Sequence, residues 1–258
     1  MDVHPLVRDE IPANQAYAGP IADAYDTWMP HDAPYHDADY FQRAIAKGSG
    51  PALELACGTG RLLVRYVLAG LDVEGVDSES DMLAICARNA QAEGVEVTLH
   101  RADVTTLALG RSYATIYNPA GSFSLHDDQD VALAALQRWS EHLRPKGRLM
   151  VAMGVPREGL DAKYEWRIRR SATRPSDGTT FLVHEAHAYD VDAQIQTTIN
   201  RFEVYDTAGR LQDTLLRRAR LRWWERAQLE AAFAGCGMVD IHSDGSDDAW
   251  ITVGSAPT

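Results

Sequence analysis

The chain has 258 residues, of which 45% are hydrophobic and 24% charged, a composition typical of a globular protein with a sizeable core. Its net charge of −12 argues against a nucleic-acid partner, because proteins that track phosphates usually carry a basic stripe. The three cysteines form no CxxC pair, which argues against disulfides and a zinc site. We find no signal peptide and no apolar run of ~18 residues, and therefore expect a cytoplasmic protein without membrane contact.

The N-terminal part predicts a loose arm followed by two helices. Residues 1–20 are rich in Pro, Ala and Gly, whereas 21–29 and 37–48 carry apolar residues at helical spacing. We expect residues 1–48 to form a helical lid.

Strands and helices then alternate. Strands are expected at 51–56, 72–77, 95–103, 113–121 and 148–155, and helices at 60–70, 78–94 and 128–147. Such alternation predicts βαβ units and a parallel sheet. After Pro156 the pattern becomes three or four antiparallel strands. A last helix at 225–237 and two strands, at 238–243 and 249–255, then complete the first sheet.

The stretch ALELACGTGRL (52–62) combines a short apolar strand, a glycine turn and a helix start. Glycines allow close backbone approach, and a helix N-terminus offers free N–H groups to the polar part of a nucleotide-like ligand. Asp77 follows at the tip of the second strand, where an acidic residue can bind a ribose. Dinucleotide sites need a third glycine, but Leu63 stands there, so an adenosine ligand is favoured over NAD or FAD.

Glu54-x-x-x-Gly58-x-Gly60 resembles the first motif of class I S-adenosylmethionine (SAM) methyltransferases. Three later segments resemble further motifs of that family in the same order: GVDSESDMLAICARN (75–89), RADV (101–104) and LRPKGRLMV (143–151), the last with Lys in place of a glycine. The meander between the fifth strand and the last helix is similar to the layout of aminosugar N-methyltransferases.

The resemblance implies a Rossmann-like fold: a seven-stranded mostly parallel sheet with helices on both faces, and a small antiparallel β meander inserted after strand five. Residues 49–155 and 225–258 would form the SAM-binding core. Residues 156–224 would form an antiparallel cap over the acceptor pocket.

The resemblance also implies SAM as the cofactor. The implied cofactor-binding residues are Tyr25, Trp28, Glu54, Ala56, Gly58, Gly60, Asp77, Ser78, Met82, Asp103, Val104 and Asn118. Glu54 would orient the amino-acid end of SAM, directly or through water, against the bare backbone at Gly58 and Gly60. Tyr25 and Trp28 would belong to the lid, although packing of an amphipathic helix explains them equally well.

The adenosine half of SAM would lie further along the motifs. Asp77 would accept both ribose hydroxyls, Met82 and Val104 would cover the two faces of the adenine, and Asp103 would accept from its exocyclic amine. Core packing is the alternative for Met82 and Val104, and a helix cap is the alternative for Asp103.

Two histidines are candidate catalytic bases. Several aminosugar N-methyltransferases place a histidine in the loop after strand four; here Ser124 stands near that position and His126 follows two residues later. A histidine pKa suits proton removal near neutrality. His184 and His187 lie three apart on a predicted strand and therefore face opposite sides, so no metal site is expected. His187 is the second candidate base.

The roles of the aromatic and basic residues of the meander are not determined by the sequence. Tyr164, Trp166, Trp223 and Trp224 could line an aromatic acceptor site or pack the small sheet on the core. The basic segment 217–226 is interleaved with Leu221, Trp223 and Trp224, and indicates a strand running into a helix with a solvated basic face.

The sequence thus predicts a SAM-dependent methyltransferase that modifies an amine or hydroxyl of a small molecule such as a secondary metabolite. A homodimer stays open. The alternatives are a non-catalytic SAM-binding protein, a methyltransferase acting on a peptide terminus, and a nucleotide-dependent oxidoreductase.

Overall fold

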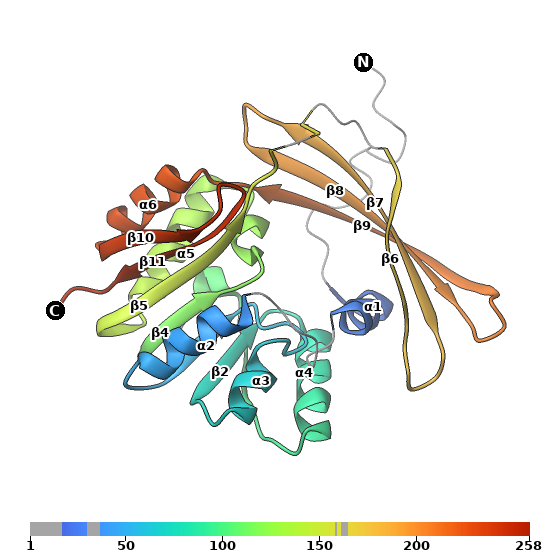
Figure 1. Cartoon of the computed structure of the whole chain (residues 1–258), viewed down its shortest axis with the longest axis horizontal. Coiled ribbons are helices and arrows are strands. Elements are labelled where there is room, and N and C mark those ends of the chain that lie inside the picture. The colour runs from blue at the N-terminus through green and yellow to red at the C-terminus, as the bar shows by residue number, and fades with distance from the viewer. Residues whose placement is uncertain (1–16, 30–36, 158, 161–164) are drawn as a thin grey trace.

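The computed structural model describes residues 17–29, 37–157, 159–160 and 165–258, which form two separate sheets (Figure 1). The strands of the larger sheet are β1 (Ala52–Leu55), β2 (Val73–Asp77), β3 (Thr98–Arg101), β4 (Tyr113–Asn118), β5 (Leu143–Gly154), β10 (Val239–Gly245) and β11 (Ala249–Ser255). Their order is β10-β11-β5-β4-β1-β2-β3; β11 pairs antiparallel with both β10 and β5, and the other described pairs are parallel. The predicted seven-stranded mostly parallel sheet is therefore confirmed.

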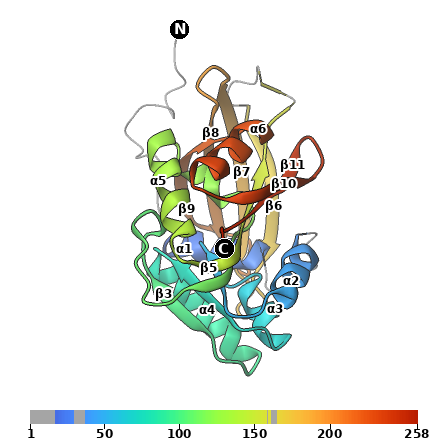
Figure 2. The ribbon, with the colours of Figure 1, turned by 90° about the vertical axis from the view of Figure 1, so that its left-hand side faces the viewer.

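Helices cover both faces of this sheet (Figure 2). One face carries α2 (Ala38–Lys47), α3 (Leu63–Leu68) and α4 (Ser80–Ala92), and the other carries α5 (Gln129–Ser140) and α6 (Arg226–Gly235). Each helix buries one apolar stripe, as Phe41 and Ile45 do on the first face and Trp139 and Phe233 on the second. None of the described helices is long and apolar enough to cross a membrane.

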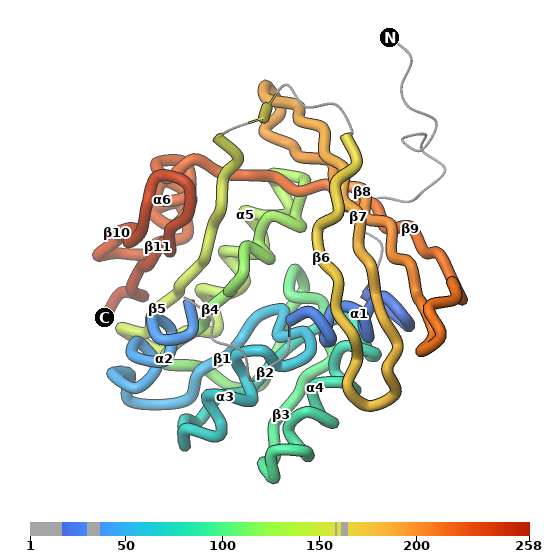
Figure 3. The backbone as a smooth tube through the Cα atoms, turned by 45° about the vertical axis from the view of Figure 1, so that its right-hand side comes forward, coloured from blue at the N-terminus to red at the C-terminus, as the bar shows by residue number. Residues whose placement is uncertain are grey.

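The smaller sheet is a four-stranded antiparallel meander. It consists of β6 (Arg167–Thr173), β7 (Thr180–Asp190), β8 (Ile195–Tyr205) and β9 (Leu211–Arg222), in that order. Helix α1 (Pro20–Trp28) lies between the two sheets (Figure 3). Its Ala24 packs on the meander and its Ala22 on Met82 of α4, so one short helix contacts both halves of the molecule.

The carboxyl ends of the parallel strands meet at one edge of the larger sheet. Strand order reverses between β1 and β4, and ligands of open α/β sheets bind beside such a switch point. Two short 3₁₀ turns stand at this edge: η2 (Val104–Thr106) after β3 and η3 (Ser122–Leu125) after β4.

The segment 141–147 differs from the expectation. The predicted helix to residue 147 ends at Ser140, and β5 already begins at Leu143. Pro145 cannot continue a helix, and Lys146 takes a left-handed φ of 61° with its N–H bonded to the Pro257 carbonyl. The strand therefore bends here, and its register with β4 shifts.

Candidate functional site

The glycine turn after β1 is left-handed at three positions. The φ angles of Ala56, Gly58 and Gly60 are 54°, 56° and 86°. A Cβ atom at Gly60 would lie 2.6 Å from the Cys86 sulfur, and one at Gly58 would lie 3.2 Å from Met82 Cε. The left-handed φ favours glycine at both positions, and at Gly60 the close approach of Cys86 on α4 leaves no room for a Cβ atom. A non-glycine residue in this conformation, as Ala56 is, costs about 1 kcal/mol or more and is often found at ligand sites.

Asp77 at the end of β2 holds this turn in place. Its side chain is buried, with 8% exposed; Oδ2 accepts from the Gly58 N–H and Oδ1 from the Glu79 N–H, both at 2.9 Å. Burial raises the pKa of Asp77, although these N–H groups oppose that rise. Each carboxylate oxygen can accept a second hydrogen bond, so Asp77 can bind hydroxyl groups in addition.

A cavity of about 520 Å³ opens at the carboxyl edge of β1, β2 and β4. Predicted site residues that line it are Tyr25, Ala56, Gly58, Asp77, Ser78, Met82, Asp103, Val104, Asn118 and His126. The structure therefore brings together most of the residues that the motifs indicated.

Other predicted residues lie away from this cavity. Trp28 stacks on Phe202 of the meander, with ring centroids 5.7 Å apart. Glu54 is 2% exposed and accepts from the Tyr117 hydroxyl at 2.8 Å. Gly60 packs against Cys86. Direct contact of these residues with SAM stays a prediction.

Asp103 both caps a turn and lines the cavity. Its Oδ1 accepts from the Thr105 N–H at 2.8 Å and from the Thr105 hydroxyl at 2.7 Å, which begins η2. The carbonyl of Val104 accepts from the Trp139 indole at 2.8 Å. Met82 is buried beside Ala22 of α1. The packing and capping alternatives thus coexist with a position at the cavity wall.

Asn118 at the end of β4 offers a free acceptor. Its Nδ2 donates to the Leu55 carbonyl at 3.3 Å, while its buried Oδ1 has no hydrogen-bond partner within the part of the chain that the structure describes. A buried unpaired oxygen is costly. A ligand that carries an N–H donor could pair with this oxygen.

His126 follows η3 and packs between rings. Its ring centroid lies 5.8 Å from that of Phe123 and 6.1 Å from that of Trp139. Burial lowers the pKa of His126 below 6.5, although Asp103 and Asp127 act in the opposite direction. Its neutral form, which can accept a proton, therefore predominates at neutral pH.

A second cavity of about 500 Å³ adjoins the first and shares Tyr17, Leu125, Arg217 and Leu221 with it. Its meander wall is polar and comprises Arg169, Glu185, His187, Tyr189, Gln196, Thr198 and Asn200. His187 lies here rather than in the first cavity. Sequence reasoning could not choose between the two faces of β7; the structure places His187, Glu185 and Tyr189 at this cavity.

The centre of the second cavity is a hydrogen-bonded Glu–His pair. His187 Nε2 lies 2.7 Å from Glu185 Oε1, and Asn200 donates to Glu185 Oε2 at 3.3 Å. Burial alone would raise the pKa of Glu185, but the neighbouring His187, Arg169 and Asn200 side chains together outweigh burial and lower it. The cavity therefore contains a stable carboxylate.

Arg217 was missed, and the interpretation of segment 217–226 as a solvated basic face is wrong. Arg217 is only 3% exposed, and its guanidinium lies 3.9 Å from the Tyr17 ring centroid. Arg217, Ala219 and Leu221 alternate along β9 and all line the second cavity. This period of two was the available signal, because alternate strand residues share a face.

The aromatic candidates have different positions. Trp224 packs on Phe123 in the core, and Trp166 lies 5.4 Å from the Arg201 guanidinium. Trp223 lines a third cavity. Tyr164 lies outside the described residues. No group of three potential metal ligands occurs among the residues that the structure describes.

The sequence was compared with protein families and with known proteins. Residues 52–147 match the family model described as a methyltransferase domain. A dTDP-3-amino-3,6-dideoxy-alpha-D-glucopyranose N,N-dimethyltransferase of Streptomyces fradiae is 30% identical over 142 residues, which cover 52% of this chain and 53% of that protein. A dTDP-3-amino-3,4,6-trideoxy-alpha-D-glucopyranose N,N-dimethyltransferase of Streptomyces venezuelae is 27% identical over 135 residues, covering 50% and 55%.

A solved structure extends the likeness of the fold. Streptomyces venezuelae DesVI superposes with a TM-score of 0.75 at 21% identity, over 94% of this chain and 100% of that one. The chain spans about half the length of the curated relatives that it matches. The methyltransferase-domain model thus matches residues 52–147, and the solved structure shares the fold of nearly the whole chain.

Proposed function

We propose that the chain transfers a methyl group from SAM to an amine of a small, hydroxyl-bearing molecule. The observation that carries this proposal is that two cavities share one wall. The first is lined by the glycine turn and Asp77, and the second by polar side chains of the meander; Tyr17, Leu125, Arg217 and Leu221 belong to both. A donor and an acceptor held in these cavities would meet at that wall.

The first cavity supplies the groups that an adenosine-containing cofactor needs. Asp77 would accept from the ribose hydroxyls, Asp103 from the adenine amine, and Asn118 Oδ1 from the amino group of the cofactor. When bound, SAM supplies an activated methyl group. The chain's part is to fix its orientation and exclude water, so that reacting atoms are held ~3–3.5 Å apart.

The second cavity suits an amine with several hydroxyl groups. Glu185 and Asp248 supply negative charges that can attract an ammonium ion, although Arg169 and Arg217 line the same cavity. Gln196, Thr198 and Asn200 offer donors and acceptors for hydroxyls. The two Streptomyces relatives are named as N,N-dimethyltransferases of amino sugars. These facts favour an amine over a phenol or an alcohol as the acceptor.

The two histidines, His126 and His187, could remove a proton from the acceptor. An amine reacts only through its free lone pair, so an ammonium substrate must first lose a proton. His126 lines the first cavity, and burial lowers its pKa, which favours the neutral ring that can accept a proton. His187, hydrogen-bonded to Glu185, can accept or relay it from the second cavity. We assign both as candidate bases.

The division of the chain into a lid, a core and a cap is also part of this proposal. We infer that residues 1–48 act as a lid and residues 156–224 as a cap over the acceptor. The contacts of α1 with the meander and with α4 of the core support this division. A homodimer and a cytoplasmic location stay predictions.

The proposal is tested by binding and turnover. Calorimetry should detect SAM and S-adenosylhomocysteine, and mass spectrometry should detect methylation within a panel of amino sugars. His126→Ala and His187→Ala should lower the rate without changing SAM affinity, whereas His242→Ala, an exposed residue on β10, should change neither. A chain that binds SAM and methylates no amine would instead be a non-catalytic SAM-binding protein or would act on another class of acceptor, such as a peptide terminus.

A further inference from the structure

A third cavity of about 680 Å³ lies at the carboxyl ends of β4 and β5, beside the β10–β11 turn. Buried apolar side chains form much of its wall: Met153, Trp223, Trp250 and Ile251. The Trp250 indole N–H is bonded to the Thr252 hydroxyl at 3.2 Å, so this ring needs no polar partner from a ligand. The methyltransferase chemistry proposed above does not use this space.

The third cavity adjoins the other two. We call the first cavity, beside Asp77, the cofactor cavity and the second, beside Glu185, the polar cavity. The third cavity shares Ala120 and Gly121 with the cofactor cavity. It shares Gly154, Pro156 and Gln196 with the polar cavity. Leu221 of β9 lines all three. A molecule held in the polar cavity can therefore extend past Leu221 into the apolar one while its amine stays beside the cofactor cavity.

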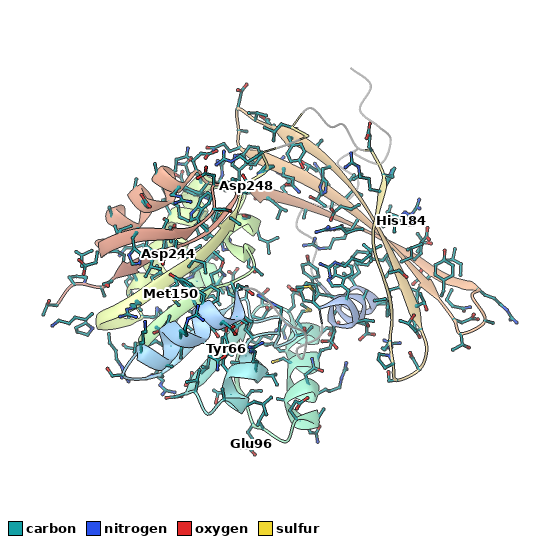
Figure 4. The ribbon with its side chains drawn as sticks, viewed as in Figure 1. Tyr66, Glu96, Met150, His184, Asp244 and Asp248 are labelled. Carbon is teal, nitrogen blue, oxygen red and sulfur yellow. The ribbon has the colours of Figure 1, made fainter. Side chains whose placement is uncertain are left out.

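The charges at the third cavity exclude a phosphate group. None of its described lining residues is Lys or Arg. Its two carboxylates are Asp37, which is paired with Arg61 at 2.7 Å, and Asp244, which accepts from the Tyr40 hydroxyl at 2.7 Å. Figure 4 labels Asp244, which lies on β10 next to β11. A diphosphate needs cationic partners, and the described wall of this cavity supplies none.

We propose that the acceptor has two parts: an amine-bearing, hydroxyl-rich unit in the polar cavity, joined without a phosphate link to an apolar ring system in the third cavity. The inference rests on the proposed function and narrows it. The ring would pack against Trp223 and Trp250, which are large apolar surfaces with preferred stacking geometries. Such an acceptor differs from the nucleotide-linked sugars for which the two Streptomyces relatives are named.

Three probes with one amine test the proposal on the full chain loaded with S-adenosylhomocysteine. They are the methyl glycoside, the 2-naphthyl glycoside and the dTDP ester of 3-amino-3,6-dideoxyglucose. Burial of the naphthyl ring should tighten binding about ten- to fiftyfold over the methyl glycoside. The dTDP ester should show no such gain.

Ala152→Leu links the gain to the cavity. Ala152 lines the third cavity and neither of the other two, so a larger side chain there should remove the naphthyl gain and leave the methyl glycoside unchanged. Ala172→Leu is the matched control, since Ala172 is half-buried on β6 and lines none of the three. Ala249→Leu at the exposed rim repeats the test without overpacking the core.

Equal affinity for the methyl and naphthyl glycosides, a naphthyl gain that survives both cavity variants, or tighter binding of the dTDP ester would overturn the two-part acceptor. These outcomes are distinct from failure of the proposed function. That failure would appear as a wild-type chain that binds SAM but methylates none of the three amines.

Discussion

A single carboxylate at the end of β2 organises the cofactor cavity. Asp77 fixes two backbone N–H groups, of Gly58 and Glu79, and still faces the cavity. Charge-assisted hydrogen bonds contribute about 1.5–3 kcal/mol. We therefore predict that Asp77→Ala weakens SAM binding about ten- to a hundredfold by calorimetry. Asp72 directly precedes the other end of β2 and lies outside the cavity, so Asp72→Ala should leave the dissociation constant unchanged. Equal losses in both variants would contradict the assignment.

Glu54 gives a pH-dependent stability. Burial raises its pKa from 4.5 to about 8, although the Tyr117 hydroxyl and Arg61 oppose the rise. The folded chain therefore holds a proton that the unfolded chain releases, and this contribution to stability is lost as pH rises from about 4.5 through 8. Glu54→Gln stays uncharged at every pH and does not lose this contribution. The melting temperature of the variant should therefore rise relative to that of the wild type between pH 5 and 8. Glu96→Gln on the exposed surface is the control, and a constant difference would refute the prediction.

Helix α1 is held by packing more than by charge. Trp28 stacks on Phe202, while Asp23 pairs at 3.0 Å with Arg174, a contact between partly exposed groups. Exposed ion pairs contribute about 0–1 kcal/mol, and loss of a packed tryptophan about 3–5 kcal/mol. Hydrogen exchange of the α1 amides should therefore accelerate strongly in Trp28→Ala and little in Asp23→Ala. The opposite order would show that ion pairs fasten the helix.

The loop after β4 is tied to the meander at Asp127. Its Oδ2 accepts from Arg220 Nε at 2.7 Å, and its carbonyl from Arg222 Nε at 2.9 Å. Because His126 precedes it, Asp127→Ala should lower kcat several-fold, with SAM affinity unchanged and a shifted pH–rate profile. Asp128→Ala removes the α5 cap instead and should cost about 1 kcal/mol of stability with kcat retained. If both variants lose only stability, Asp127 does not position the loop.

At the scale of the whole molecule, local pattern predicted more of the core than of the acceptor region. The parallel sheet could be predicted from the alternation of strands and helices. The residues of the glycine turn could be predicted as well, because each directly follows the strand that positions it. Arg217 and Tyr17 are 200 positions apart, and their meeting depends on how the meander sits over the core. The positions of Trp28 and Glu54 likewise follow from packing between elements, which no local period contains.

Binding of the cofactor should also raise the melting temperature of the whole chain. A ligand at a hundred times its dissociation constant that binds only the folded state adds about 2.7 kcal/mol. For a chain of this size that corresponds to a melting-temperature rise of about 5–10 °C. We predict this rise with SAM and with S-adenosylhomocysteine, and none with NADH, because Leu63 stands where a dinucleotide site needs glycine. Asp77→Ala should abolish most of the rise at the same ligand concentration. A rise with NADH alone would place the chain among dinucleotide-dependent enzymes despite its methyltransferase domain.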